Sequence, residues 1–210
     1  MITDFKKVKY VFMTGIAAGV PNAIDPEKHI RLGDVVISDK AGVIQYDMLK
    51  ITEEGIEHRN TNIASNARLL EACKKLRLDC NGKFEDIIYS ERPDATTDVL
   101  HDEQKNIIPH PIQKNREIDK PCLFIGNIGS ANILLKHREY RDEIVSKFNI
   151  RAFEMEGSGI SDATWQGEVG YLVVRGISDY GDTFKNDIWH EYAAAASASV
   201  TAAILRRLVV

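Results

Sequence analysis

The stretch YLVVRGISDYGD, residues 171–182, decides the fold class. Its first part, YLVV, is a short apolar run rich in β-branched and aromatic side chains, and the glycine, serine and aspartate after it mark an end. This pattern is typical of a strand that is buried on both faces. Three runs of the same character lie earlier in the chain, at residues 8–13 (VKYVFM), 35–37 (VVI) and 122–125 (CLFI). The sequence therefore predicts a core of several strands.

Helical patterns separate these strands. Apolar residues or alanines recur at helical spacing in residues 61–76, 139–148, 155–166 and 188–208. Strands that alternate with helices indicate an α/β domain with a mostly parallel sheet and helices on both of its faces. Ligands of such domains bind at the loops after the carboxyl ends of strands, so we expect the chemistry there.

Composition limits the class of protein. The 210 residues are 44% hydrophobic and 28% charged, which describes one globular domain with its own core. No apolar run approaches the roughly 18 residues of a membrane-spanning helix, and the first ten residues lack the apolar stretch of a signal peptide, so we expect a cytoplasmic protein. The net charge is −4, with basic and acidic residues interleaved, which argues against nucleic-acid binding.

The cysteines and the segment over residues 90–120 give two further predictions. The cysteines, Cys73, Cys80 and Cys122, have neither CxxC nor histidine-partnered spacing. They predict reduced thiols, with neither a disulfide framework nor a zinc site. Residues 90–120 contain three prolines and no periodicity, which predicts a long surface excursion that serves either as a lid or as a partner contact.

Small residues follow the first predicted strand in MTGIAAGV, residues 13–20. Small side chains let a ligand approach the backbone and leave N–H groups free to meet an anion or a sugar oxygen. The segment is not a Walker loop and lacks GxGxxG spacing. A plain tight turn after the strand is therefore an equally good interpretation.

Two carboxylates stand at the next junction, in FEMEGSG, residues 153–159. A strand over residues 150–153 should end here, and a helix should begin. A carboxylate that faces a cleft, from Glu154 or Glu156, accepts two hydrogen bonds from a vicinal diol, as in ribose binding. The alternative is a capping or dipole role at the start of the helix.

A third candidate lies after the predicted strand over residues 171–174. Asp179 follows a buried run, where general acids occur in α/β enzymes, and burial would favour its protonated, donating form. The alternative is a turn or helix cap, for which Ser178 and Asp182 compete.

The order of these motifs resembles the nucleoside phosphorylase and nucleosidase superfamily, which includes purine nucleoside phosphorylases and methylthioadenosine/S-adenosylhomocysteine nucleosidases. Further matches are RLGDVVIS (31–38), GVIQYD (42–47), ERP (91–93) and KNDIWHEYAA (185–194). The resemblance runs from about residue 8 to the C-terminus and is closest to the domains found fused to NLR-like and other defence proteins. It implies a three-layer α/β/α fold with a central, mostly parallel, mixed sheet.

The resemblance also implies roles for individual residues. Glu156 would bind the ribose 2′- and 3′-hydroxyls, and Met155 would pack against the sugar. Asp179, oriented by Ser178, would protonate purine N7 so that the base leaves as a neutral group. The other expected ligand contacts are Ile128, Gly129 and Ser130 at the purine, Gly15, Ala17 and Ala18 beside the sugar or nucleophile, and Phe184 as a residue that closes over the ligand.

The chain departs from the family at the nucleophile. Phosphorylases of the family grip phosphate with an arginine and a serine, and Met13 and Ile16 stand at the matching positions. Neither side chain replaces a charge-assisted phosphate clamp, so hydrolysis is favoured over phosphorolysis. The first strand of the family, which carries an acid, has no match, so we expect residues 1–210 to form a single domain that is incomplete at its N-terminus. Three acids remain candidates for the role of the acid on that missing strand: Asp25, Glu27 and Asp47.

These implications predict a nucleosidase that cleaves an adenine-containing nucleoside to free base and sugar, with no metal or organic cofactor. Its partner would be a small purine nucleoside or nucleotide, with neither nucleic acid nor membrane, and it would form a dimer or larger homo-oligomer. Three alternatives remain: a phosphorolytic purine nucleoside phosphorylase, a non-catalytic nucleoside-binding module, and an adenine-nucleotide nucleosidase that acts in defence. In the last, a polyphosphate would meet one or more of the residues Lys28, His29, Arg31 and Arg92.

Overall fold

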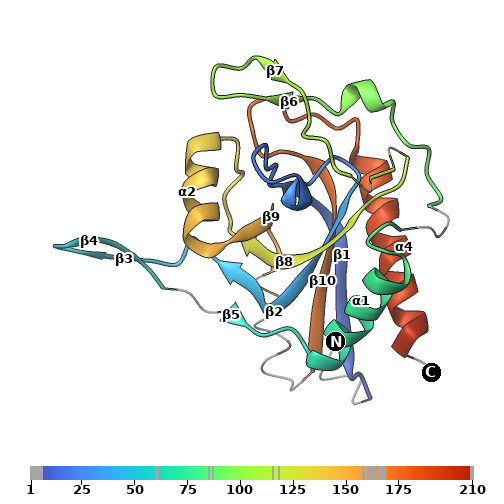
Figure 1. Ribbon diagram of the computed structural model, residues 1–210. Helices are drawn as coiled ribbons and strands as arrows, with labels where there is room; N and C mark the ends of the chain where they lie inside the picture. The colour runs from blue at the N-terminus through green and yellow to red at the C-terminus, as the bar shows by residue number, and fades with distance from the viewer. Residues whose placement is uncertain are drawn as a thin grey trace.

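A mixed sheet forms the centre of the molecule (Figure 1). The computed structural model describes residues 7–59, 62–84, 86, 88–114, 116–117, 119–157, 159, 164 and 169–208. The six-stranded sheet has the order β10-β1-β9-β8-β2-β5, and β10 also pairs with β2, so that the sheet curves around on itself. Its strands are β1 (Tyr10–Gly19), β2 (Val35–Gln45), β5 (Asn62–Ile63), β8 (Leu123–Ser130), β9 (Ile150–Glu154) and β10 (Gly170–Asp179).

The long pairings in this sheet are parallel. They join β1 to β10, β2 to β8, and β8 to β9. The antiparallel pairings, β1 with β9, β2 with β10, and β2 with β5, cover only two or three residue pairs each. The predicted mostly parallel, mixed sheet is therefore confirmed. The strand β10 is buried over all but its first residue, which explains its continuous apolar run.

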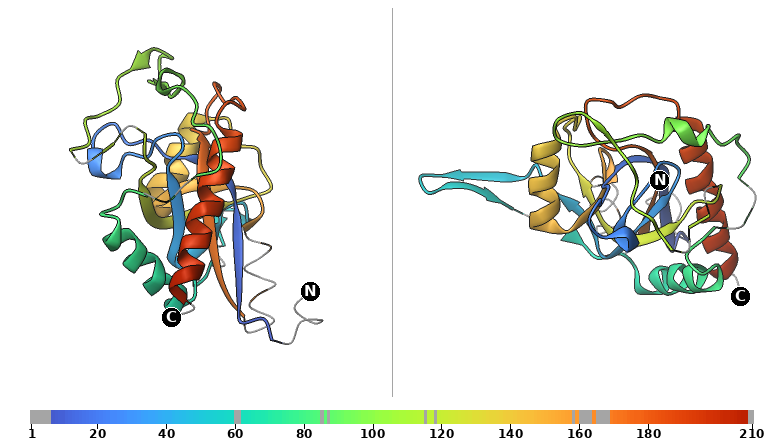
Figure 2. Two further views of the ribbon diagram at one scale, coloured as in Figure 1. Left: turned by 90° about the vertical axis from the view of Figure 1, so that its right-hand side faces the viewer. Right: turned by 45° about the horizontal axis from the view of Figure 1, so that its top comes forward.

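Helices lie on both sides of the sheet, as predicted. The described helices are α1 (Ala67–Asp79), α2 (Arg138–Phe148) and α4 (His190–Leu208). The views in Figures 1 and 2 place α1 and α4 on one side and α2 on the other. The alanine-rich α4 lies directly on β10, where a Cβ at Gly176 would stand 1.9 Å from the carbonyl oxygen of Ala193. Only glycine allows this approach of helix to strand.

The structure differs from the prediction at the start of α1 and does not describe most of another predicted helix. The pattern in residues 61–76 predicted an earlier start for α1, but the Asn66 side chain accepts hydrogen bonds from the N–H groups of Arg68 and Leu69 and begins the helix at Ala67. The preceding Asn62 and Ile63 form β5 instead. Most of the predicted helix over residues 155–166 lies outside the described residues.

The interpretation of MTGIAAGV as a turn after a strand is wrong, because β1 continues through it to Gly19. The small residues make room for side chains of the neighbouring β10. A Cβ at Gly15 would stand 2.3 Å from Arg175 Nη1, and one at Gly19 would stand 2.6 Å from Ile177 Cγ2. At Gly15 and Gly19 the absence of a side chain therefore serves packing within the sheet.

Short elements complete the chain. The hairpin of β3 (Leu49–Thr52) and β4 (Gly55–His58), which the sequence patterns did not predict, projects from the molecule (Figure 1). The excursion over residues 90–120 is largely irregular, as predicted, and the elements among its described residues are η2 (Ala95–Thr97), β6 (Leu100–His101) and β7 (Ile107–Ile108). A turn of 3-10 helix, η1 (Pro26–Lys28), follows β1. Within the described part of the chain, no helix combines the length and apolar character needed to span a bilayer.

A chain of buried hydrogen bonds ties the 90–120 excursion to the sheet. His29 Nδ1 accepts from the N–H of Asn22 at 3.0 Å, and His29 Nε2 lies 2.9 Å from His110 Nδ1. His110 Nε2 lies 2.8 Å from the carbonyl oxygen of Asp98. Because that carbonyl only accepts, His110 Nε2 carries a proton and donates it to this bond. His29 Nδ1 also lies 3.1 Å from the carbonyl oxygen of Asn22.

Acid is expected to destabilise the protein through this pair. Burial and the neighbouring His110 lower the pKa of His29 from 6.5 to about 4, and burial lowers the pKa of His110. Between these values the unfolded chain binds more protons than the folded one. The contribution of this pair to the free energy of unfolding is therefore fully present above about pH 6.5. It is lost as the pH falls toward 4, by up to about 3 kcal/mol for His29. The positive charges of Arg31 and Arg116 also lower the pKa of His29.

Urea unfolding at pH 7 and pH 5 measures this loss. His29→Gln removes the titrating group, so its stability should fall less over this range than that of the wild type. His58→Gln, which removes a histidine outside the pair, should keep the wild-type dependence. An equal decline in the His29→Gln variant and the wild type would contradict the assignment.

Candidate active site

Asp179 ends β10, and its buried carboxylate is held by three donors. Ser178 Oγ donates to Oδ2 at 3.1 Å, and the N–H of Gly181 donates to Oδ1 at 2.9 Å. Lys185 Nζ lies 3.1 Å from Oδ2. The expectation that Ser178 orients Asp179 agrees with this geometry, whereas Lys185 is a partner that sequence reasoning missed. Its position six residues beyond Asp179 has no periodicity that would have revealed it.

The backbone beside Asp179 is fixed from two directions. The Tyr180 hydroxyl donates to Asp98 Oδ1 at 2.6 Å, and burial together with Asp98 raises the pKa of Tyr180 well above 10. The carbonyl oxygen of Tyr180 accepts from Arg141 Nη1 at 2.6 Å. Gly181 follows with φ +64°, a left-handed conformation that favours glycine. The carboxylate of Asp179 therefore stands on a rigid support.

The two acids of FEMEG have different environments. Glu154 is buried at the end of β9 and accepts the N–H of Glu156 at 3.0 Å and that of Gly157 at 2.8 and 2.9 Å. The capping interpretation therefore holds for Glu154. The Glu156 side chain is 61% exposed and faces Arg175 at 3.3 Å. Only Glu156 keeps carboxylate oxygens available to a ligand.

Arg175 links these acids to β1. Its Nη2 contacts Glu154 and Glu156 and lies 3.4 Å from Met13 Sδ. The missing Cβ of Gly15 leaves the space that the guanidinium occupies. Because the buried Glu154 neutralises this buried arginine, Arg175 is not a free cation for an anionic ligand.

A cavity of about 190 Å³ brings the three motifs together. Its lining residues are Ile16, Ala17, Ala18, Tyr46, Ile133, Leu134, Leu135, Phe153, Glu154, Met155, Glu156, Ser178, Asp179 and Lys185. A second cavity of about 360 Å³ shares Ser178, Asp179 and Lys185 with it. Phe184 and His101 line the second cavity and stack on each other with ring centroids 3.6 Å apart.

The structure places most of the expected ligand contacts at these cavities. Six of them line the first cavity, namely Ala17, Ala18, Met155, Glu156, Ser178 and Asp179, and Phe184 lines the second. Gly15 lies beneath Arg175 instead. Ile128, Gly129 and Ser130 belong to β8 and line neither cavity, and Ile128 is completely buried in the core.

The apolar wall of the first cavity comes from the segment after β8. Ile133 and Leu134 are about half exposed there, and Leu135 is buried. Sequence reasoning missed these three residues. The available signal was an apolar triplet in a loop after a strand end, where no core strand explains it.

The other residues that the sequence analysis kept open are engaged elsewhere. Asp47 Oδ2 accepts from the N–H of Asn132 at 2.8 Å, and Asp25 pairs with Lys28. His29 is buried against His110, Arg31 pairs with Asp98, and Arg92 lies 4.9 Å from the ring centroid of Trp189. The candidate acids and polyphosphate cations, Glu27 among them, are absent from the described linings of both cavities that contain Asp179.

Comparisons with known proteins identify the family of this chain. The family model of the phosphorylase superfamily matches residues 1–209. The chain belongs to this superfamily. A nucleotide-binding leucine-rich repeat (NLR)-like protein of Hyaloscypha variabilis is 30% identical over 98% of the chain and 22% of its own length. ATP nucleosidase Cap17 of Escherichia coli is 30% identical over 98% of the chain and 37% of its own length.

Solved structures have a fold similar to that of this chain. The 5′-methylthioadenosine/S-adenosylhomocysteine nucleosidase of Neisseria meningitidis, in complex with methylthio-immucillin-A, has a TM-score of 0.66 and 22% identity. The match covers 98% of this chain and 72% of that one. The chain spans only about a fifth to somewhat more than a third of the two curated relatives above.

Proposed function

We propose that this superfamily member is a purine nucleosidase that hydrolyses the N-glycosidic bond of an adenine-containing nucleoside. The single observation that carries the proposal is the cavity in which Asp179, Glu156 and Met155 meet the apolar wall of Ile133 and Leu134. A buried acid, an exposed diol-binding acid and an apolar wall are the three elements that a purine nucleoside requires.

The reaction follows from the positions of these groups. Asp179 donates a proton to purine N7, and the electrons of the C1′–N9 bond leave with the neutral base. Glu156 accepts hydrogen bonds from the ribose 2′- and 3′-hydroxyls and holds the sugar while positive charge develops at C1′. Water then adds to C1′, and the proton that it releases restores the protonated carboxyl of Asp179, so that the cycle closes. Lys185 Nζ, 3.1 Å from Asp179 Oδ2, holds this carboxyl in place.

Hydrolysis is proposed over phosphorolysis because of Met13, Ile16 and Arg175. Ile16 lines the cavity with an alkyl side chain, and Met13 presents sulfur to Arg175. The guanidinium of Arg175 is paired with Glu154. These side chains leave no charge-assisted clamp for phosphate at this wall.

A second candidate substrate is an adenine nucleotide. It is favoured by the 30% identity to a protein described as an ATP nucleosidase. Lys185 is the cation that the two Asp179 cavities share and is only partly exposed. In this alternative, Lys185 exchanges its contact with Asp179 for one with a phosphate of the nucleotide.

Base release tests the proposal. The protein is incubated with adenosine, methylthioadenosine, inosine and ATP, with and without phosphate, and the free base is separated and quantified. We expect adenine release that does not depend on phosphate. Release that requires phosphate would overturn the argument from Met13 and Ile16. Binding of a nucleoside without any release would support a binding module instead.

Glu156→Ala is expected to reduce affinity for ribose-containing substrates by about tenfold to a hundredfold, because two hydrogen bonds to a charged acceptor are lost. Substrates that lack the 2′-hydroxyl should lose much less. The measurement is KM and kcat/KM for paired ribo- and 2′-deoxynucleosides. Equal losses for the two substrates would contradict the diol role.

A further inference from the structure

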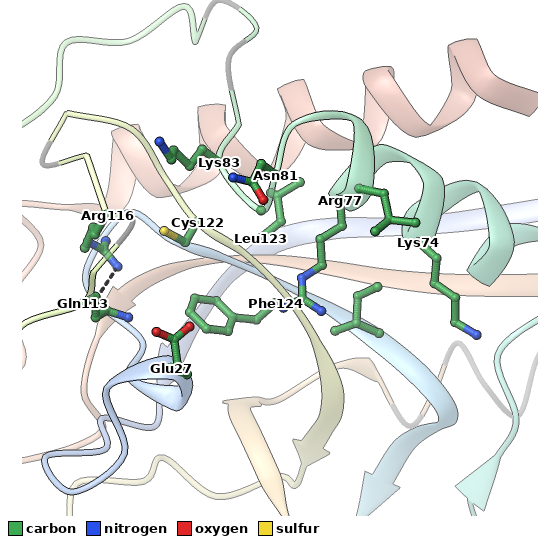
Figure 3. A pocket seen from close by; sticks show the side chains of 13 residues that line it. Glu27, Lys74, Arg77, Asn81, Lys83, Gln113, Arg116, Cys122, Leu123 and Phe124 are labelled. Atoms are coloured by element: carbon green, nitrogen blue, oxygen red, sulfur yellow. Dashed lines mark hydrogen bonds between the residues drawn. The ribbon is translucent and has the colours of Figure 1, made fainter.

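A third cavity lies beside α1 and the beginning of β8 (Figure 3). It measures about 650 Å³, within the range of roughly 300–1,000 Å³ that small-molecule sites occupy. Its described lining has no residue in common with the two cavities that contain Asp179. It includes Phe124 near the start of β8, whereas Ile133 and Leu134 follow the end of that strand. The cavity is therefore a separate candidate site.

The floor of this cavity is apolar. Phe124 lines it from β8, and Leu78 adds an apolar side chain from α1 that is 79% exposed. An exposed leucine alone needs no explanation, but a leucine and an aromatic ring in the lining of one hollow form a surface for a flat ring.

Two cations line the α1 side without a counter-ion. Lys74 and Arg77 are exposed and have no ion-pair partner among the described residues. Arg77 extends from α1 toward Phe124, as Figure 3 shows. Lys83, by contrast, is neutralised by Glu117 at 2.6 Å. Unpaired guanidinium and ammonium groups beside an apolar floor suit an anion attached to a ring.

Arg116 contributes an independent observation at the opposite end. Its side chain is only 6% exposed, and its Nη1 and Nη2 bind Asp34 at 3.0 and 2.7 Å. Its Nε is buried with no hydrogen-bond partner in the described part of the chain. A buried N–H without an acceptor is costly. Because Asp34 neutralises the guanidinium, Arg116 closes this end of the cavity as part of an ion pair.

We propose that this cavity binds a flat heteroaromatic compound that carries a phosphate. The ring lies on Phe124, and the phosphate binds Arg77 and Lys74. The inference does not depend on the proposed nucleosidase activity, because it concerns a different cavity and only binding.

Flavin mononucleotide is the probe for the test. It is fluorescent, has acceptor atoms on its ring and a phosphate, and contains no N-glycosidic bond for the proposed hydrolase to cleave. Fluorescence titration should show that it binds about tenfold or more tightly than riboflavin, which lacks the phosphate. Arg77→Glu should weaken its binding by about tenfold or more. Lys75→Glu, at an exposed lysine of α1 outside the cavity, should change it by less than about twofold.

Three results would overturn the inference: no saturable binding, equal affinity for flavin mononucleotide and riboflavin, or equal effects of Arg77→Glu and Lys75→Glu. Glu156→Ala, which is expected to weaken ligand binding at the proposed active site, should leave the affinity for flavin mononucleotide unchanged. A loss of binding in Glu156→Ala would place the probe at the proposed active site and overturn the inference without affecting the proposed function. A negative base-release assay would overturn the proposed function and leave this binding result as it stands.

Discussion

Asp179→Asn is expected to lower the rate of base release by about 10²- to 10⁴-fold while preserving nucleoside binding. The side-chain amide has nearly the shape of the carboxyl and keeps an oxygen that can accept the N–H of Gly181. It has no acidic proton for purine N7, so the base would have to leave as an anion. The loss should appear in kcat, with the dissociation constant of a non-hydrolysable nucleoside analogue changed only slightly.

Asp187→Asn is the matched control for this experiment. Asp187 lies in the same loop, is highly exposed and pairs with His190 at 3.4 Å, outside the cavities around Asp179. Its replacement should leave kcat within about twofold, because surface pairs contribute little. If Asp179→Asn retained wild-type turnover, or lost analogue binding and turnover together, Asp179 would not be the proton donor.

Arg175→Met is expected to lower the free energy of unfolding by about 3–5 kcal/mol. Arg175 and Glu154 form a buried pair, with side-chain exposures of 4% and 1%. Removal of the guanidinium leaves the Glu154 carboxylate without its counter-charge in a place that water does not reach. Urea unfolding monitored by tryptophan fluorescence measures the effect, and the midpoint should fall without a change in slope.

The double variant Arg175→Met/Glu154→Gln separates charge from packing. With no buried charge left, it should recover most of the lost stability, although it loses the contact with Met13. Arg207→Met removes a more exposed arginine, paired with Asp79 at 3.0 Å, and should cost less than about 1 kcal/mol. A similar cost for Arg175→Met and Arg207→Met would show that the buried pair contributes little.

Local patterns were sufficient for much of the fold. The runs VVI and YLVV lie in β2 and β10, and CLFI enters β8 at Leu123, since a strand buried on both faces must be apolar throughout. The helix α2 was predicted to within one residue, because its apolar spacing ends at Asn149, whose left-handed conformation closes the helix. The β3–β4 hairpin was missed because its side chains are largely exposed and no burial imposes a pattern on them.

The family motifs located the site but did not show which of its two neighbouring glutamates is buried and which is exposed. The sequence placed Glu154 and Glu156 two residues apart with the same chemistry. Tertiary contacts separate them, because Arg175 and two backbone N–H groups engage Glu154 while Glu156 remains exposed. In the same way, MTGIAAGV has the composition of a turn, and only the neighbouring β10 side chains show why small residues are needed inside a strand.

The sequence by itself determined the α/β class, the superfamily and the neighbourhood of Asp179, because apolar periodicity and short motifs are properties of contiguous residues. Only the tertiary structure decided that Lys185 pairs with Asp179, that Ile133 and Leu134 line the cavity while Ile128 lies in the core, and that Lys74, Arg77 and Arg116 surround a separate hollow. The physical reason is that exposure, counter-charge and unsatisfied hydrogen bonds depend on residues that are distant in the chain, and these properties decide what a side chain can bind.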